Sequence, residues 1–375
     1  MNEIRDLHND AMEQADLALI NRLNGDFESA RKLFLEAFSY EAEVANYYLT
    51  RFSEEPTRSV IFRSAAALAL DAGLLSDAEK YAASGLSGAA PDDIKDQLRE
   101  IIEKANFNRH LSLKGLELEP NEFQFVIAGN STYAGVAKSD EVLDRVVDIK
   151  TLFYRTMERQ NKKPYRNGGV SPYAEKYPVY LSSVRPSSFA ITLRIGSPDQ
   201  DQLPYVDEHD PTAEVIREFL DCIELVNHNE EKELRERIPD DAYYNNFLSL
   251  AQNMAPDGEN VSIVGFTSSY EGKERRVELS NKRDSISGIA RAINSNSSTE
   301  KKRHELIGRL LFAEGTDANS SGKIRLNTAE GKLTIKVPEG MDDIVMRLWN
   351  HQVKVIAIKV DRRNYLMEKI EANDT

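Results

Sequence analysis

The chain has 375 residues, of which 41% are hydrophobic, and its 62 acidic and 48 basic side chains give it a formal net charge of −14. This length predicts two or three domains, because single hydrophobic cores usually stop growing at about 250–300 residues. The negative charge opposes nonspecific attraction to nucleic acid and to anionic membranes, and the single cysteine, Cys222, excludes an intrachain disulfide and a multi-cysteine metal site.

The N-terminal residues and the hydropathy of the chain indicate its compartment. Residues 1–14 are acidic and polar, whereas a signal peptide begins with a basic segment and continues with an apolar one. No segment approaches the run of about 18 apolar residues that marks a membrane-spanning helix. We therefore expect a soluble cytoplasmic protein without a membrane partner.

Two similar segments predict a stack of helical hairpins at residues 1–108. NGDFESARKLFLEAF, at residues 24–38, recurs as AGLLSDAEKYAASGL, at residues 72–86, with an offset of 48 residues. In each copy a glycine supplies the left-handed end of one helix, and small residues on the next helix allow a neighbouring helix to approach closely. The predicted packing residues are Gly25, Ala30, Phe34, Ala37, Phe38, Gly73, Ala78, Gly85 and Leu86.

The first copy resembles the tetratricopeptide repeat, in which a Gly-Asp-aromatic turn is followed by alanine, an aromatic residue, alanine and an apolar residue. The second copy departs from this pattern at Ala82 and Gly85, and the offset is longer than the family period of about 34 residues. The resemblance implies stacked helical hairpins with a surface for a protein partner. The matching residues are Gly25, Asp26, Phe27, Ala30, Phe34, Ala37 and Phe38.

Residues 109–291 mix strand and helix patterns and predict an α+β domain. Apolar alternation predicts strands at 111–118, 123–127, 187–196, 261–268 and 275–281, the last two joined by a hairpin turn. Apolar periodicity predicts helices at 139–160, 212–227 and 240–254. A loop is expected at 163–178.

The polar, serine-rich run at 292–302 predicts a linker, and residues 303–375 predict a small five-stranded β-barrel. Three strands, a short helix and two further strands follow in the order of an OB-fold, with an SH3-like barrel as the alternative. The helix is expected to plug the barrel, and Arg347 and Trp349 are a candidate anchor for a partner. Residues 301–375 carry 14 basic and 11 acidic side chains, so this segment alone is positively charged.

No motif predicts a catalytic, cofactor-binding or metal-binding residue. The loop after the strand at 123–127 lacks the glycine spacing of phosphate-binding loops, and the six histidines are scattered. The nucleophile elbow of serine hydrolases is absent from the sequence. We expect no cofactor, and an interaction protein more than an enzyme, although a hydrolase assembled from distant residues stays open.

A basic cluster at the end of the helix expected at 139–160 is a candidate site for an anionic ligand or RNA. Tyr154 and Tyr165 lie between its cations and are available for stacking. The attraction of cations to a helix C-terminus explains the same placement without a ligand. The candidate residues are Arg155, Arg159, Lys162, Lys163 and Arg166, together with Arg185 and Arg194.

The sequence thus predicts a non-enzymatic scaffold or regulatory protein that binds another protein through its helical module. The alternative is a nucleic-acid-binding or nucleic-acid-sensing factor that uses the C-terminal barrel and the basic helix end at residues 155–166. The arrangement resembles multidomain bacterial proteins, which implies a regulatory or defence-associated role.

Overall fold

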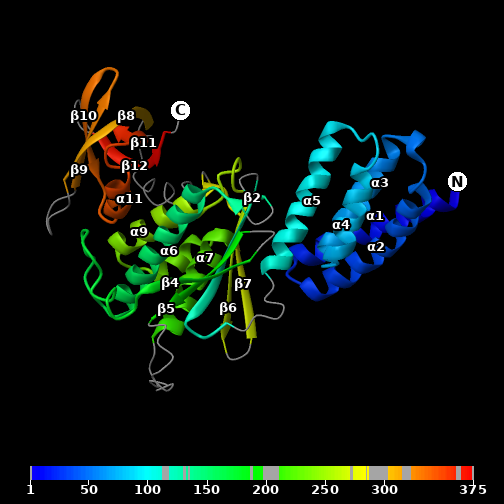
Figure 1. Cartoon of the computed structure of the whole chain (residues 1–375), viewed down its shortest axis with the longest axis horizontal. Coiled ribbons are helices and arrows are strands. Elements are labelled where there is room, and N and C mark those ends of the chain that lie inside the picture. Colours follow the sequence, from blue (N-terminus) through cyan, green and yellow to red (C-terminus); the bar gives the residue numbers. More distant parts are fainter. Residues whose placement is uncertain are drawn as a thin grey trace. The chain divides into compact units, whose positions relative to one another are not determined.

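The computed structural model is mixed α+β and divides into two units, Met1–Ser112 and Leu113–Thr375 (Figure 1). We call the first the helical unit and the second the sheet unit. The residues that the structure describes are 2–111, 118–129, 132–133, 136–185, 189–196, 211–270, 273–283, 285–286, 303–314, 322–359 and 365–373. The predicted linker at 292–302 lies outside these ranges.

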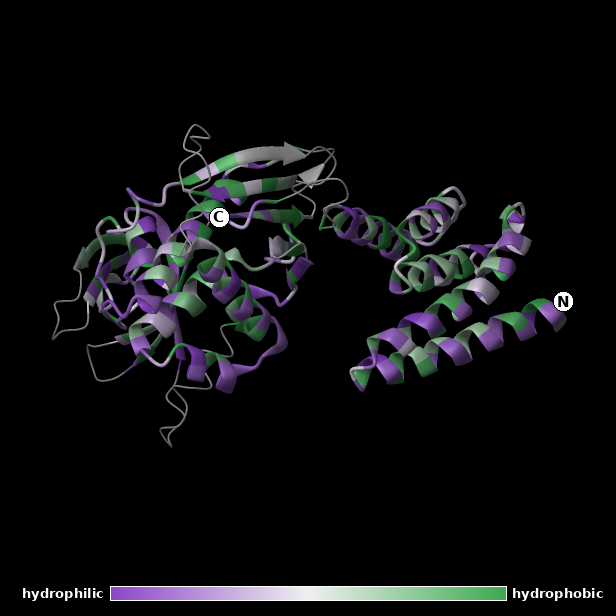
Figure 2. Cartoon of the chain, turned by 90° about the horizontal axis from the view of Figure 1, so that it is seen from below, coloured by the Kyte–Doolittle hydropathy of each residue, from purple (hydrophilic) through white to green (hydrophobic). Residues whose placement is uncertain are grey.

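The helical unit is built from five α-helices in succession. Each helix packs against the next one along the chain, and the third helix also packs against the fifth. Apolar residues recur along each of them (Figure 2). The helices are α1 (Asn2–Leu23), α2 (Phe27–Tyr48), α3 (Thr57–Asp71), α4 (Leu75–Leu86) and α5 (Asp92–Leu111), with a 3₁₀ turn at Phe52–Glu54 between α2 and α3.

The turns after α1 and α3 have the same backbone structure. Gly25 and Gly73 adopt φ values of 81° and 79°, a left-handed conformation that favours glycine. The next amide reaches back five residues in each turn: Asp26 donates to the carbonyl of Asn21 at 2.9 Å, and Leu74 to that of Ala69 at 2.8 Å. In each turn the glycine amide also donates to the carbonyl three residues earlier, of Arg22 or of Leu70, and the two bonds together form a Schellman motif. The sequence repeat therefore corresponds to a repeated helix end.

Small side chains lie where these helices meet. Ala18 on α1 and Ala37 on α2 are fully buried, as is Ala78 on α4. A Cβ atom at Gly85 would stand 2.9 Å from a terminal carbon of Leu98 and 3.0 Å from the Cβ of Phe62. Glycine at this position therefore lets α4 contact both α3 and α5 closely.

The sheet unit contains a five-stranded antiparallel sheet with the order β4-β5-β1-β6-β7. The hairpin expected between the last two strands is present, and Tyr270 pairs with Lys273. The strands are β1 (Glu122–Ala128), β4 (Val179–Arg185), β5 (Phe189–Ile195), β6 (Ile263–Tyr270) and β7 (Lys273–Leu279); a separate two-stranded ribbon joins β2 (Thr132–Tyr133) and β3 (Val136–Ala137).

Two strand predictions in this region differ from the structure. Leu111 ends helix α5 instead of opening a strand, and residues 112–117 lie outside the described ranges. The sequence pattern also missed the edge strand β4, because it follows a loop rich in proline and glycine and carries two serines.

Three long helices form one hydrophobic core with the sheet. They are α6 (Ser139–Gln160), α7 (Thr212–His228) and α9 (Asp241–Met254), with the short α8 (Glu231–Arg237) between the last two. Phe219 on α7 contacts Phe123 on β1 and Phe266 on β6, with ring centroids 6.1 and 5.3 Å apart. The three helices expected at 139–160, 212–227 and 240–254 are thus confirmed within about a residue at each end.

The C-terminal strands form a second five-stranded sheet with the order β10-β12-β11-β8-β9, and β9 pairs in turn with β10. β10 and β12 run parallel, and the other pairs run antiparallel. The elements are β8 (Arg303–Glu314), β9 (Gly322–Thr328), β10 (Gly331–Val337), α11 (Asp342–Arg347), β11 (Gln352–Lys359) and β12 (Tyr365–Ala372).

These strands continue the hydrophobic core of the central sheet. α11 packs against α9, and Arg155 on α6 holds the carboxylate of Asp343 with two bonds, of 3.0 and 3.1 Å. The amide of Asn246 on α9 donates to the same carboxylate at 2.9 Å. We call this contact between α11, α6 and α9 the seam.

Candidate functional site: the apolar end of the helical unit

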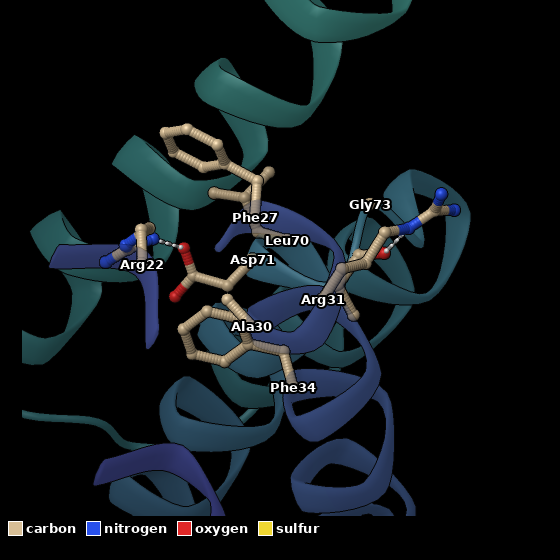
Figure 3. Close-up of a pocket in the computed structure, with 9 residues that line it drawn as sticks. Arg22, Phe27, Ala30, Arg31, Phe34, Leu70, Asp71 and Gly73 are labelled. Atoms are coloured by element: carbon tan, nitrogen blue, oxygen red, sulfur yellow. Dashed lines mark hydrogen bonds and ion pairs between the residues drawn. The ribbon is translucent and has the colours of Figure 1, made fainter. Parts of the chain in front are cut away.

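A cavity of about 250 Å³ opens where α1 ends, α2 begins and α3 ends (Figure 3). The two glycine turns frame it, because Gly25 precedes α2 and Gly73 lies on its wall. Its walls are mainly apolar, with three charged side chains at the edge. The lining residues are Arg22, Phe27, Ala30, Arg31, Phe34, Leu70, Asp71, Ala72 and Gly73.

An ion pair and a cation–π contact fix the charged side of this cavity. The guanidinium of Arg22 donates to Asp71 at 2.9 Å and lies 5.2 Å from the ring centroid of the buried Phe34. Arg31 donates from Nε to the carbonyl of Ala72 at 3.2 Å, which caps the end of α3. Both partners of the ion pair are more than one third exposed, so it orients the rim and contributes little to stability.

The second half of α1 is apolar on both of its faces. Ala18 points into the unit and is fully buried, whereas Leu17, Ile20 and Leu23 lie on the other side of the helix. Ile20 is 54% exposed and Leu23 is 87% exposed. Phe27, at the start of α2 and on the wall of the cavity, is 70% exposed. We call Leu17, Ile20, Leu23 and Phe27 the apolar end.

Large apolar side chains gathered on one surface usually mark an interaction site. A helix that is apolar on all sides is normally buried, and the outermost helix of a stack normally presents a polar face to water. In the described part of the chain, the apolar end is neither buried nor replaced by a polar outer face. The cavity can accept an apolar side chain of another protein between Phe27 and Leu70, and Ile20 and Leu23 add exposed apolar surface outside its lining.

The sequence did not single out the apolar end, because Leu17, Ile20 and Leu23 match no repeat or motif and Phe27 was identified only as part of the repeat turn. A signal was nevertheless present: LALINRL, at residues 17–23, carries more apolar residues than the single buried stripe of a surface helix requires. Of the predicted packing residues, Gly25 and Gly73 are exposed in the turns, and the others lie in the interior. Ala30, Phe34, Ala37, Ala78 and Gly85 are buried, and Phe38 and Leu86 are half-buried, with Phe38 edge-on to Tyr81 at 5.6 Å.

The structure places the predicted basic helix end among carboxylates. Arg155 is 3% exposed and bonds to Asp343 and to Glu158. Arg159 donates to Glu218 at 2.8 Å, and Arg166 donates to Glu158 at 3.2 Å. Because Glu218 and Asp343 are distant in sequence from α6, counting nearby charges could not reveal this neutralisation.

The remaining predicted cations do not gather with these arginines. Lys162 and Lys163 are exposed after the end of α6. Arg194, on β5, lies 4.0 Å from the carboxylate of Glu122. Arg185 is the last residue of β4, and its side chain is outside the described set.

The two candidate anchor residues of the C-terminal helix have different surroundings. Arg347 pairs with Asp148 on α6, and burial lowers the pKa of its guanidinium. Trp349 is 59% exposed. The geometry therefore assigns Arg347 to the seam and leaves Trp349 on the surface.

Two buried titratable groups of the sheet unit, Cys222 and Tyr165, have surroundings that oppose their ionisation. Burial, reinforced by the neighbouring Glu218, raises the pKa of the Cys222 thiol to about 12, so the thiolate is scarce at neutral pH. Burial likewise raises the pKa of Tyr165. Within the described ranges, no three His, Cys, Asp or Glu side chains converge as metal ligands do.

Comparison with family models, with curated proteins and with solved structures found no match to this chain. In the part of the chain that the structure describes, every helix is too short or too polar to cross a membrane.

Proposed function

We propose that this protein is a non-enzymatic scaffold or regulatory protein and that its helical unit binds another protein. The observation that carries the proposal is the apolar end beside a cavity of about 250 Å³. Covering Leu23, Ile20 and Phe27 would remove exposed apolar area from water, which stabilises a complex by about 25 cal/mol per Å² before association costs.

The geometry also indicates what the partner presents. The cavity has room for one large side chain, and its walls of Phe27, Phe34 and Leu70 favour an apolar or aromatic one. The guanidinium of Arg31 at the rim favours a carboxylate next to that anchor. The proposed ligand is thus a segment of another protein with an apolar anchor and an adjacent acidic residue.

The tetratricopeptide-like and OB-like architectures belong to the same proposal. The matching Schellman turns at Gly25 and Gly73 support repeated hairpins. An OB-like arrangement of the last five strands is supported by their mutual pairing and by the position of α11 between the third and fourth strands. The SH3-like barrel is the alternative.

The test is capture of partners from the native host by the immobilised full chain. The variant Ile20→Glu/Leu23→Glu/Phe27→Glu places three charges in the apolar end. A matched control, Leu143→Glu/Val170→Glu/Met346→Glu, changes three exposed apolar residues of the sheet unit by the same chemistry. We expect a protein that the wild type and the control retain and that the variant loses.

The captured protein is then purified and titrated against each form. We expect the apolar-end variant to bind at least tenfold more weakly, because hot-spot truncations cost about 2 kcal/mol or more. A further variant, Trp349→Ala, tests the other exposed anchor and should leave the affinity unchanged. Equal binding by the wild type and the apolar-end variant would refute the proposal.

A further inference from the structure

The outer surface of β8, β9 and β10 carries a group of cations. The outward residues of β9 and β10 alternate with buried ones, as in a sheet with one face on a core. None of the outward side chains described on these two strands is acidic. We call this surface the basic face; its cations are Arg309, Lys323, Arg325, Lys332 and Lys336, all exposed.

The strand register brings these cations together. Lys332 pairs with Asn327, which in turn pairs with Arg309, so these three lie in a row across three strands. Lys323 lies directly opposite Lys336. Like charges in directly opposed positions destabilise a sheet, and an anion bound between them would relieve the repulsion.

Three carboxylates of the C-terminal strands pair with cations outside the basic face, whereas Glu314 on β8 lies opposite Lys323 in the strand register. Glu368 bonds to Arg303, and Glu305 and Glu371 pair with Lys354 and Lys369. In the described ranges, Lys323, Arg325, Lys332 and Lys336 form no ion pair. This differs from the basic helix end, where each of the three arginines contacts a carboxylate.

An exposed aromatic ring lies on the same face. Phe312, on β8, is 43% exposed, and the guanidinium carbon of Arg325 stands 5.3 Å from its ring centroid. Leu311 beside it is also exposed. An apolar ring next to cations suits a ligand that has both negative charge and flat aromatic groups.

We propose that the basic face binds single-stranded nucleic acid. The cations would hold backbone phosphates, and bases would stack on Phe312 and on the guanidinium of Arg325. Unpaired bases expose their faces for such stacking, whereas those of a duplex are stacked on one another. The chain as a whole has a charge of −14, so this attraction is confined to the face and weakens with salt.

The test measures fluorescence anisotropy of a labelled 20-nucleotide oligo(dT) or oligo(U) with the full chain at several salt concentrations. The face variant Lys323→Gln/Arg325→Gln/Lys332→Gln/Lys336→Gln removes four cations. The control Lys32→Gln/Lys95→Gln/Arg99→Gln/Lys104→Gln removes four cations of the helical unit, so its net charge is the same as that of the face variant. Circular dichroism checks that every variant is folded.

We expect the wild type and the control to bind, and the face variant to bind at least tenfold more weakly. The plot of log affinity against log salt should become shallower by about 2–3 units in the face variant, because each lost phosphate contact removes about 0.7. Phe312→Ala should weaken binding while leaving that slope unchanged. Lys162→Gln/Lys163→Gln, at the end of α6, should bind like the wild type.

Four results would overturn the proposal. They are no binding by the wild type at low salt, equal losses in the face variant and its control, tighter binding of a duplex than of the single strand, and equal binding of poly-glutamate or of vesicles with anionic lipid.

Discussion

Gly85 shows how the size of a single residue determines helix packing in the helical unit. It lies inside α4, where glycine costs about 1 kcal/mol relative to alanine. The close contacts of that position with Leu98 and Phe62 explain why a larger residue is absent. Overpacking such a site typically costs about 1–3 kcal/mol, which exceeds the gain in helix propensity.

Glu41, on α2, is a buried carboxyl group whose ionisation opposes folding. Its Oε2 lies 2.8 Å from Nδ1 of His8 on α1, and its Oε1 has no hydrogen-bond partner among the described residues. Burial raises the pKa of Glu41, although His8 and Arg63 oppose the shift. The folded state therefore binds the proton more tightly than the unfolded state does. The stability that proton binding by Glu41 contributes is lost as the pH rises through the folded-state pKa.

We expect Glu41→Gln to stabilise the helical unit at pH 8 by about 0.5–2 kcal/mol, because glutamine is neutral at every pH. The gain should shrink toward pH 4, where the glutamate itself is protonated. Thermal unfolding followed by circular dichroism at both pH values measures it. Glu43→Gln, at an exposed position of the same helix, is the control and should change little. A gain that is larger at pH 4 than at pH 8 would contradict this explanation.

At the scale of elements, the seam determines how the C-terminal strands attach to the central sheet. Arg155 is almost fully buried, and Asp343 is its partner from α11. The guanidinium carbon of Arg155 lies 4.3 Å from the ring centroid of Tyr165, and the Tyr165 hydroxyl donates to the carbonyl of Gly340. The guanidinium of Arg155, the ring of Tyr165 and the side-chain amide of Asn246 thus meet at the first turn of α11.

We expect Asp343→Ala to lower the stability of the sheet unit by about 3–5 kcal/mol, because it leaves the charge of Arg155 buried without this partner. The double variant Arg155→Met/Asp343→Ala should recover part of the loss, with a coupling energy of about 0.5–3 kcal/mol. Denaturant unfolding of the full chain measures both. Arg276→Gln, which removes an exposed pair with Glu274, should cost less than about 1 kcal/mol. Strictly additive effects of the two seam substitutions would argue against the coupling.

The elements differ in how far the sequence predicts them. α6, α7 and α9 follow from apolar periodicity, because their apolar residues are buried in one shared hydrophobic core. β4 does not, since an edge strand needs little burial and gains its structure from pairing with β5. The Gly25 and Gly73 turns were predictable because a left-handed helix end depends on the local sequence, chiefly on the glycine itself.

The candidate site was less predictable than the fold. The apolar end joins residues of α1 and α2 beside a cavity that α3 also lines, and its significance lies in exposure, which the sequence pattern does not report. The basic face depends on the register of β8, β9 and β10. The basic helix end was visible in the sequence, but two of the carboxylates that contact it, Glu218 and Asp343, come from α7 and α11.

At the scale of the whole molecule, the two units offer surfaces of different chemistry. The helical unit exposes apolar residues next to a cavity, and the sheet unit exposes cations on its last strands. A scaffold with these surfaces would hold a protein on one unit and a nucleic acid strand on the other. Each surface has its own variants, so each proposal stands or fails separately.

The most direct measurement is hydrogen exchange of the full chain, followed by mass spectrometry, with and without the captured protein partner. The central claim is that the partner covers the apolar end. We therefore predict slower exchange of backbone amides at residues 17–27 and 70–74 in the complex, and unchanged exchange in α6. Protection elsewhere in the chain, with residues 17–27 unaffected by the bound partner, would contradict the claim.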